Sequence, residues 1–324
     1  MLNRRHTLAL GLAAGLAAPA IARAQAWRPT RPVRLIVPFA PGGSNDIVSR
    51  IIADPVGRLL GQPLVIENRA GAGSVIGAEA TARAAPDGYT ILINSAHATV
   101  PAIVANMPYR TVEDFAGVAI AGFSPHLLAC ANSFPAQTAQ EMVAHLRANP
   151  GRYTFATAGI GSGVHLAIEL LKAQAQVEGE LVHYRGGGPS VVALVSGESQ
   201  IGTPTMASSI SQVRAGGIRA LAVLASERSP ALPNVPSAPE VGLPGLIHEE
   251  FFPILAPAGT PRPVLEALGA AFRTAINESA ARMVELSGVA PRAGFETPDQ
   301  VMALVRDGVQ RYTAILRSAG VEAR

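Results

Sequence analysis

The sequence predicts an α/β protein, and three observations support this class. Short apolar runs of strand type alternate with longer segments in which apolar residues recur at helical spacing. Glycine, proline and serine mark the junctions between them. The 324 residues are 48% hydrophobic and 15% charged, which is ample core for two domains of ordinary size. Strands that alternate with helices in this way indicate parallel sheets with helices on both faces.

The elements follow one another in a regular order as far as residue 225. The expected strands are 33–39, 63–68, 89–94, 126–132, 152–158, 180–184 and 218–225. The expected helices begin at Asn45 and continue with 73–85, 161–175 and 188–198. Each helix follows a strand, as in repeated strand–helix units.

The chain changes character after residue 225. Segment 226–245 is rich in proline and serine, so it cannot be one regular element and predicts a covering loop or a crossing between domains. The apolar run 251–261 then leads to three helix-patterned segments that end by Gly320. Thr297 provides a good start for the last of them.

The first 26 residues have the layout of a bacterial export signal. They contain Arg4 and Arg5, an apolar stretch at 8–18 that is too short for a membrane span, and small residues around Ala24 and Ala26. We expect cleavage near Ala24 or Ala26 and a mature protein in the periplasm. The paired arginines leave both the twin-arginine route and general secretion open. Because no cysteine lies near the cleavage region, we expect no lipid anchor.

The charge balance argues against a nucleic-acid-binding protein, and the cysteine content excludes an intramolecular disulfide. The signal-like segment holds three arginines and no acids, so the 26 basic residues of the chain fall to 23, equal to the 23 acidic residues. This balance lacks the basic excess of a nucleic-acid binder. Cys130 is the only cysteine, which excludes an intramolecular disulfide, and we expect its sulfur in the core of strand 126–132.

Three strand-to-helix turns are built from small residues. At such a turn, free backbone N–H groups and the positive end of the helix dipole meet at one spot, which attracts anions. One turn alone is explained equally well by a capped helix start, whereas three of them suggest a shared anion site. The three turns contain Gly42, Gly43 and Ser44; Gly71, Gly73 and Ser74; and Gly159, Gly161 and Ser162.

Better-known motifs do not fit these turns. A dinucleotide-binding fingerprint would need glycine at Ile76, and a phosphate-binding P-loop would need a lysine that is not there, since Lys172 is the only lysine. The G-x-S-x-G elbow of serine hydrolases does not occur, and no two histidines have the spacing of a zinc site. We therefore expect no cofactor and no bound metal.

The whole chain after residue 26 resembles a known family, the periplasmic substrate-binding receptors of tripartite tricarboxylate transporters, often called Bug proteins. The resemblance rests on an ordered set of segments: PFAPGGSNDIVSR, GQPLVIENRAGAGSVIG, APDGYTIL, NPGRYTFATAGIGSGVHLAIELL, VHYRGGGPSVVALVSG, IRALAVLASERSPALPNVPSAPEVGLPG and APAGTP. It implies a two-domain Venus-flytrap fold of the type II periplasmic-binding-protein kind, each domain a mainly parallel sheet flanked by helices. The first domain would comprise 27–127 and 248–324, and the second 128–247.

The resemblance also implies a function and a set of site residues. A small organic carboxylate would bind between the domains and pass to membrane permease subunits, with no catalysis and with the receptor as a monomer. One wall would contain Phe39, Pro41, Gly42, Gly43, Ser44 and Asp46, with Gly73, Ser74, Ser95 and His97 beside them. The facing wall would contain Thr157, Gly159, Gly161, Ser162, His165, Tyr184 and Arg185.

Two departures and two alternatives accompany this interpretation. Ser74 stands where the family commonly has glycine, and 199–205 lacks an aspartate that is common there, which favours a ligand without an amine. The protein could instead present its ligand to a sensor kinase. It could also be a periplasmic hydrolase that uses Ser162 with His165, or Asp46 with His97.

Overall fold

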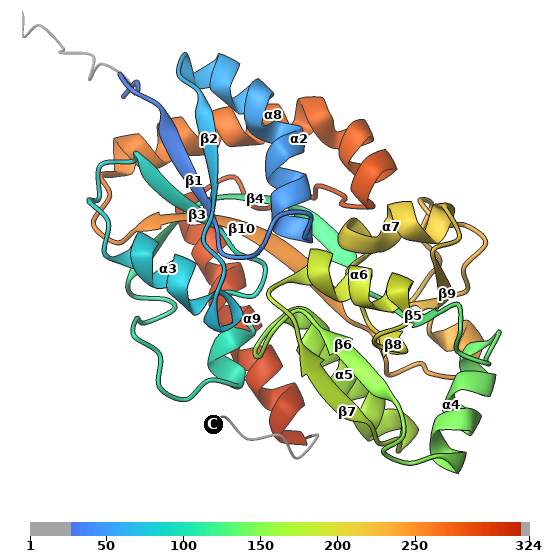
Figure 1. Ribbon diagram of the computed structural model, residues 1–324. Helices are drawn as coiled ribbons and strands as arrows, with labels where there is room; N and C mark the ends of the chain where they lie inside the picture. The colour runs from blue at the N-terminus through green and yellow to red at the C-terminus, as the bar shows by residue number, and fades with distance from the viewer. Residues whose placement is uncertain (1–26, 319–324) are drawn as a thin grey trace, which may run out of the picture.

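The computed structural model describes residues 27–318, so the expected export signal and its cleavage site lie outside the described residues. The chain forms two lobes, each built on one five-stranded sheet with helices on both faces (Figure 1). The α/β class predicted from the sequence is confirmed.

The first sheet has the strand order β2-β1-β3-β10-β4. Its strands are β1 (Val33–Val37), β2 (Leu64–Asn68), β3 (Thr90–Ile93), β4 (Phe115–Pro125) and β10 (Glu249–Pro257). β1 is parallel to β2 and β3, and β10 is antiparallel to β3 and β4. Four strands therefore share one direction and β10 alone is reversed.

The second sheet repeats this plan with the order β7-β6-β8-β5-β9. Its strands are β5 (Leu127–Ala131), β6 (Thr154–Thr157), β7 (Glu180–His183), β8 (Ile201–Gly202) and β9 (Ile218–Val223). Here β5 is the reversed strand. Both sheets are mixed for the same reason. The chain enters the second lobe through β5 and re-enters the first through β10, and each of these strands runs antiparallel to its neighbours.

Helices cover both faces of the first sheet. Its helices are α2 (Ser44–Leu60), α3 (Val75–Ala82), α8 (Arg262–Ser287) and α9 (Pro298–Ser318), with the short 3-10 helices η1 (Ala72–Ser74) and η2 (Val100–Ala102). Val33, Leu35 and Val37 pack with α2 and α8, whereas Ile36 belongs to the cluster that contains α3 and α9. β1 is thus buried on both faces, which explains its uninterrupted apolar sequence.

The second sheet is covered in the same way. Its helices are α4 (Ala139–Ala148), α5 (Gly163–Ala175), α6 (Gly187–Ser196) and α7 (Met206–Arg214), with the 3-10 helix η3 (Pro239–Val241). Leu128 and Cys130 face α4 and α5, while Leu127 and Ala129 face α7 and α6. The predicted burial of the Cys130 sulfur is confirmed, because the residue is 0% exposed.

The chain crosses between the lobes at two places that lie side by side. His126 N donates to His248 O at 3.1 Å, His248 N donates to Leu224 O at 2.9 Å, and Leu224 N donates to His126 O at 2.8 Å. Before the second crossing, segment 226–245 packs on the second lobe, where Leu232 is buried with residues of β9 and α7. The lobes are therefore joined through a short hydrogen-bonded junction.

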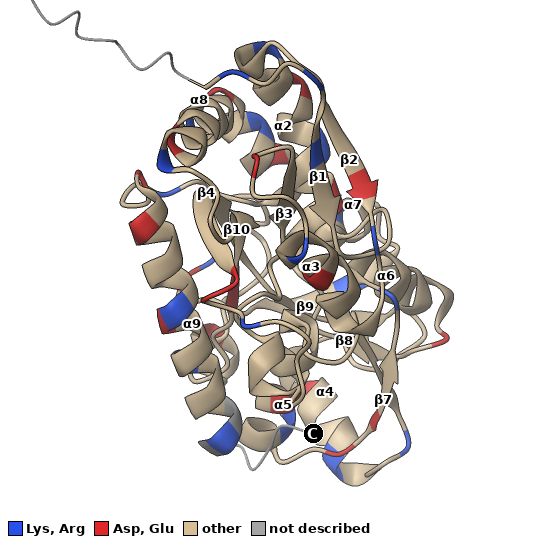
Figure 2. Ribbon diagram, turned by 90° about the vertical axis from the view of Figure 1, so that its left-hand side faces the viewer, with Lys and Arg blue, Asp and Glu red and all other residues tan. Residues whose placement is uncertain are grey.

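The C-terminal part differs from the sequence-based expectation in its number of helices. Two helices, α8 and α9, replace the expected three, because the helical spacing runs without a break through the 26 residues of α8. Helix α9 starts at Pro298, next to the expected Thr297, and extends along the side of the molecule from β4 to α5 (Figure 2).

Candidate functional site

The N-terminal ends of two helices from different lobes meet at one cavity between the lobes. α2 begins at Ser44 after Gly43, which is extended (φ −81°, ψ 170°), and α5 begins at Gly163 after Ser162. Ser162 caps α5, because its hydroxyl accepts a hydrogen bond from His165 N at 3.2 Å. The first N–H groups of a helix have no partners within it and lie at the positive end of its dipole. Two positive helix ends on opposite walls are an arrangement that attracts an anion.

The cavity itself is small in this arrangement of the lobes. Its volume of about 10 Å³ is room for about one water molecule. Five residues expected from the sequence line the cavity: Phe39, Gly43, Ser44, Ser95 and Ser162. Six others that sequence reasoning did not select as site residues also line it: Asn45, Ala158, Val164, Gly187, Thr205 and Glu250.

Residues of the two lobes form hydrogen bonds with each other around the cavity. Ala40 N donates to Arg185 O at 3.1 Å, and Thr99 Oγ1 donates to Gly161 O at 2.6 Å. Gly73 lies so close to the other lobe that a Cβ atom there would come 1.8 Å from the carbonyl oxygen of Ile160. The structure is therefore a closed one, and the approach at residue 73 requires glycine.

Beside the cavity lies a second hollow of about 220 Å³, also formed by both lobes. Six residues expected from the sequence line it: Phe39, Gly73, Ser74, Gly159, Tyr184 and Arg185. It is completed by Gly71, Ala72, Ala158, Ile160 and His183. Phe39 and Ala158 line both spaces, so the two are neighbours.

Asn45, which sequence reasoning considered as a helix cap or a donor to the ligand, fixes the first wall. Its Nδ2 donates to Ser95 Oγ at 2.9 Å, and its Oδ1 accepts from Ser95 N at 2.9 Å. This reciprocal pair joins the start of α2 to the loop after β3. The signal for it in the sequence was the polar Ser-Asn-Asp run at the start of the helix.

Seven of the expected site residues line neither space. They are Pro41, Gly42, Asp46, His97, Thr157, Gly161 and His165. Asp46 holds the first turn together, because its carboxylate accepts from Gly42 N at 3.0 Å, from Arg50 at 2.9 Å and from Asn68 at 3.1 Å. Burial favours the neutral acid, but these hydrogen bonds outweigh it and hold the pKa of Asp46 below its usual value.

His97 lies in the core of the first lobe. It is 0% exposed, its Nε2 is 2.8 Å from Thr111 O, and its ring is stacked on Tyr109 and edge-on to Phe115. Burial lowers the pKa of His97 to about 4, so the ring is neutral at pH 7. Its expected position at the ligand came from the family resemblance, and a place after a strand does not define the direction of a side chain.

Thr157 and His165 shape the turn of the second lobe. Thr157 Oγ1 is 2.7 Å from His183 Nδ1 and accepts from Gly159 N at 3.2 Å. His165 Nδ1 accepts from Gly161 N at 3.2 Å. These side chains hold the turn from behind, so that the Ser162 end of α5 faces the cavity.

A family model described as tripartite tricarboxylate transporter family receptor matches residues 48–321. The chain belongs to this receptor family. Protein BugT of Bordetella pertussis is 35% identical over 313 residues, which cover 95% of this chain and 94% of BugT. A protein encoded in the tcbD-tcbE intergenic region of Pseudomonas sp. strain P51 is also 35% identical, over 97% of this chain and 94% of its own length.

Solved structures of the receptor family have the same fold. The periplasmic binding protein BugD superposes with a TM-score of 0.88 at 30% identity, covering 91% of this chain and 100% of BugD. MatC from Rhodopseudomonas palustris, solved with bound malate, gives 0.85 at 33% identity over 89% and 99% of the two chains. A second R. palustris protein, solved with adipate, gives 0.85 at 30% identity over 91% and 99%. The chain is thus a periplasmic solute-binding protein of the Bug type.

The two hydrolase pairings considered from the sequence do not form in this receptor. Ser162 Oγ donates to Gly159 O at 2.7 Å, while Nδ1 of His165 is occupied by Gly161 N. Asp46 and His97 likewise have the separate partners given above. Within residues 27–318, no group of three or more His, Cys, Asp or Glu side chains is placed to hold a metal ion.

No helix between residues 27 and 318 is long and apolar enough to cross a membrane.

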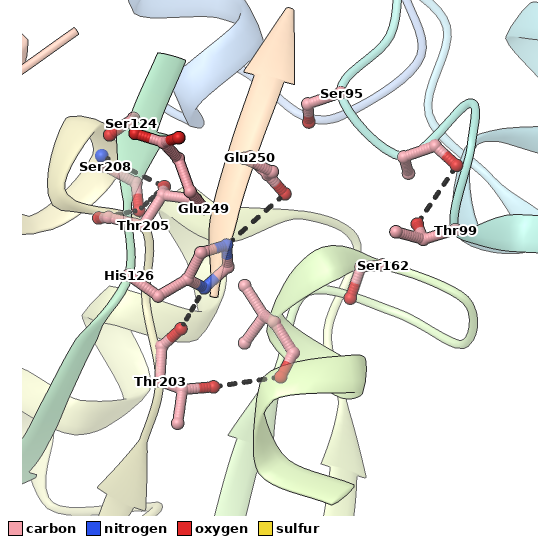
Figure 3. Close-up of polar contacts among 12 residues, drawn as sticks. Ser95, Thr99, Ser124, His126, Ser162, Thr203, Thr205, Ser208, Glu249 and Glu250 are labelled. Atoms are coloured by element: carbon pink, nitrogen blue, oxygen red, sulfur yellow. Dashed lines mark hydrogen bonds and ion pairs between the residues drawn. The ribbon is translucent and has the colours of Figure 1, made fainter. Parts of the chain in front are cut away.

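The receptor also has a buried acid in its cavity, which sequence reasoning missed. Glu250 is 4% exposed, and one of its oxygens, Oε2, has no hydrogen-bond partner among the described residues. Figure 3 shows it between Ser95 of the first lobe and Ser162 of the second, with His126 on its other side. Burial raises the pKa of Glu250 to about 7, although the hydroxyls of Ser95 and Ser44 oppose this shift.

Proposed function

We propose that this receptor captures a small organic carboxylate in the cavity between its lobes and delivers it to the membrane permease subunits of a tripartite tricarboxylate-type transporter. One observation carries the proposal: the N-terminal ends of α2 and α5, from different lobes, converge on one space. A hydrogen bond from an N–H group to a charged oxygen contributes about 1.5–3 kcal/mol. Two or three such bonds from each lobe are sufficient for micromolar affinity, about −8 kcal/mol.

The known ligands of relatives support this class of compound. Malate and adipate, which occupy two of the solved relatives, are both dicarboxylates. In our proposal a carboxylate binds to the backbone of the Gly43–Ser44 turn and of the Ser162–Gly163 turn. The remainder of the ligand extends toward the hollow lined by Gly73 and Tyr184.

Binding requires the lobes to move. The lobes touch each other around the cavity, so we propose that the ligand enters an open form and that the lobes close over it. We propose that the hinge lies at the paired crossings near His126 and His248. The domain boundaries would then fall there, with 27–127 and 248–324 in one domain and 128–247 in the other.

We propose that the receptor works as a monomer in the periplasm after loss of its first 26 residues. Its role in uptake can be tested in cells that encode the cognate permease. Deletion of the receptor gene should abolish uptake of the bound acid, and re-expression should restore it. Uptake that continues unchanged after deletion would contradict a role in transport.

A thermal-shift and calorimetry screen tests binding directly. The panel consists of dicarboxylates, hydroxy acids, aromatic acids and amino acids, each with the amide of the same acid as a control that keeps the shape and removes the charge. Ligand at 100 times its dissociation constant should stabilise the folded receptor by about 2.7 kcal/mol. The amides should give no shift. Equal shifts with acid and amide, or none with any acid, would refute the proposal.

A further inference from the structure

Glu250 places a buried acid in the wall of a cavity that is otherwise suited to anions. It lies at the start of β10, and its side chain is 5% exposed. A Cβ atom on Gly163, the first residue of α5, would lie 2.5 Å from Glu250 Oε1. The carboxyl group therefore lines the cavity next to the start of α5, and it also interacts with the serine hydroxyls of the first lobe (Figure 3).

The neighbour of Glu250 in the hinge does not supply a cation. His126 Nδ1 is 2.7 Å from Thr203 O, an acceptor only, so Nδ1 carries the proton and Nε2 presents a lone pair. His126 Nε2 is 3.8 Å from Glu250 Oε1, too far for a hydrogen bond, and has no other partner among the described residues. Burial lowers the pKa of His126 to about 4, so the ring is neutral at pH 7. His126 Nε2 and Glu250 Oε2 are thus both buried without a hydrogen-bond partner among the described residues.

A ligand with a cationic donor resolves this imbalance. An ammonium group in the cavity can donate a hydrogen bond to Glu250 Oε2, which has no partner among the described residues. Its charge also compensates the buried carboxylate, which is costly to leave unpaired. A ligand that presents a second carboxylate at this point would instead set two negative charges against each other.

We propose that Glu250 is a specificity-determining residue, which selects a carboxylate ligand that carries a protonated amine, as an amino acid does, by accepting hydrogen bonds from the ammonium group. This inference depends on the function proposed above and specifies the ligand class of the same site. The preference for a ligand without an amine, drawn from segment 199–205, did not take Glu250 into account.

Matched acids that differ at one substituent test the proposal. We would measure dissociation constants by calorimetry at pH 7 for aspartate, malate and succinate, for glutamate, 2-hydroxyglutarate and glutarate, and for phenylalanine, phenyllactate and 3-phenylpropionate. In the series that fits the cavity, the amino acid should bind at least tenfold more tightly than the unsubstituted acid. Glu250→Gln should remove this preference.

Glu249→Gln is the matched control. Glu249 is the preceding residue, and its carboxylate pairs with Arg292 outside the cavity. This variant should keep the wild-type preference. Tighter binding of the hydroxy or unsubstituted acid by the wild type, or an unchanged preference in Glu250→Gln, would refute the selection of an amine while leaving the receptor function intact. Failure of all nine acids and of the wider panel to bind would refute the proposed function itself, and this inference with it.

A measurement on the wild-type protein covers the case in which Glu250→Gln does not fold. The titratable groups of this cluster are His126, which lies 3.8 Å from Glu250, His248, whose ring packs on that of His126, and Tyr312 on α9, which interacts electrostatically with Glu250. A nearby cation is Arg311, which donates a hydrogen bond to the Tyr312 hydroxyl. Burial lowers the pKa of both histidines and raises that of Tyr312, so none of the three titrates near pH 7.

Glu250 is then the group of this cluster that exchanges protons on binding at pH 7. An ammonium ligand stabilises its carboxylate form, so binding should release about half a proton per site. Calorimetric enthalpies in phosphate and in Tris, whose ionisation heats differ, measure this number. Uptake of a proton with the tightest acid, or no exchange, would overturn the proposal.

Discussion

Gly73→Ala tests the closed contact between the lobes. Gly73 has a left-handed conformation (φ +63°), and a Cβ atom there would lie 1.8 Å from Ile160 O on the other lobe. The substitution therefore has two separable effects. It strains the backbone in every state of the protein, and it prevents the lobes from reaching the arrangement seen here.

The two effects differ in magnitude and in what they change. An alanine in the left-handed region costs about 1–2 kcal/mol of folding stability. If the clash separates the lobes, the hydrogen bonds from Thr99 to Gly161 and from Ala40 to Arg185 are lost as well. At about 1 kcal/mol for each bond, closure loses about 2 kcal/mol, which corresponds to about thirtyfold weaker binding.

Gly61→Ala provides the control. Gly61 lies at the C-terminal end of α2 with φ +72°, and a Cβ atom there would have no neighbour within 4 Å. Both variants should lose similar stability in thermal unfolding without ligand. Only Gly73→Ala should bind the acid more weakly in calorimetry and remain expanded with ligand in small-angle scattering. Equal affinities and equal scattering for the two variants would refute the argument that this contact forms on binding.

Three further results are expected. Thr99→Val removes the hydroxyl that donates to Gly161 O of the other lobe, so ligand affinity should fall about fivefold, or about 1 kcal/mol, in calorimetry. His97→Phe keeps the aromatic packing and loses one hydrogen bond, so the free energy of unfolding in urea should fall by about 1–2 kcal/mol. A tenfold change in ligand affinity would contradict the position of His97 in the core. Urea unfolding should also show stability lost as pH falls from 6.5 to 4, because His97 and His126 protonate near 6.5 when unfolded and only near 4 when folded. The free energy of unfolding should fall by about 3 kcal/mol for each histidine. Glu250, whose pKa is raised to about 7 by burial, is more stable protonated in the folded state and offsets the loss from about one histidine. A free energy of unfolding that does not fall would contradict the neutral buried rings.

Much of the fold could be predicted because the relevant signals are local. Short apolar strand patterns identified β1, β2, β3, β6 and β7 to within a few residues. The strand pattern around Cys130 predicted its burial correctly. The reversal of β5 and β10 could not be predicted in this way, because it depends on which lobe the chain has just left.

The composition of the site was less predictable, because it depends on side-chain direction and on the meeting of distant segments. The family resemblance selected Ser95, which lines the cavity, together with His97, which turns into the core. Glu250 was missed because an acid at the start of a strand normally faces solvent, as Glu249 does. Its burial follows from the contact of β10 with α5 of the other lobe, which no local pattern encodes.

The central claim is that helix ends from opposing lobes bind one carboxylate, and a crystal structure with the tightest-binding acid tests it most directly. The account predicts one carboxylate with oxygens about 3 Å from backbone N–H groups at both the Gly43–Ser44 turn and the Ser162–Gly163 turn. A carboxylate held by one lobe alone, or bound outside the space between these turns, would contradict it.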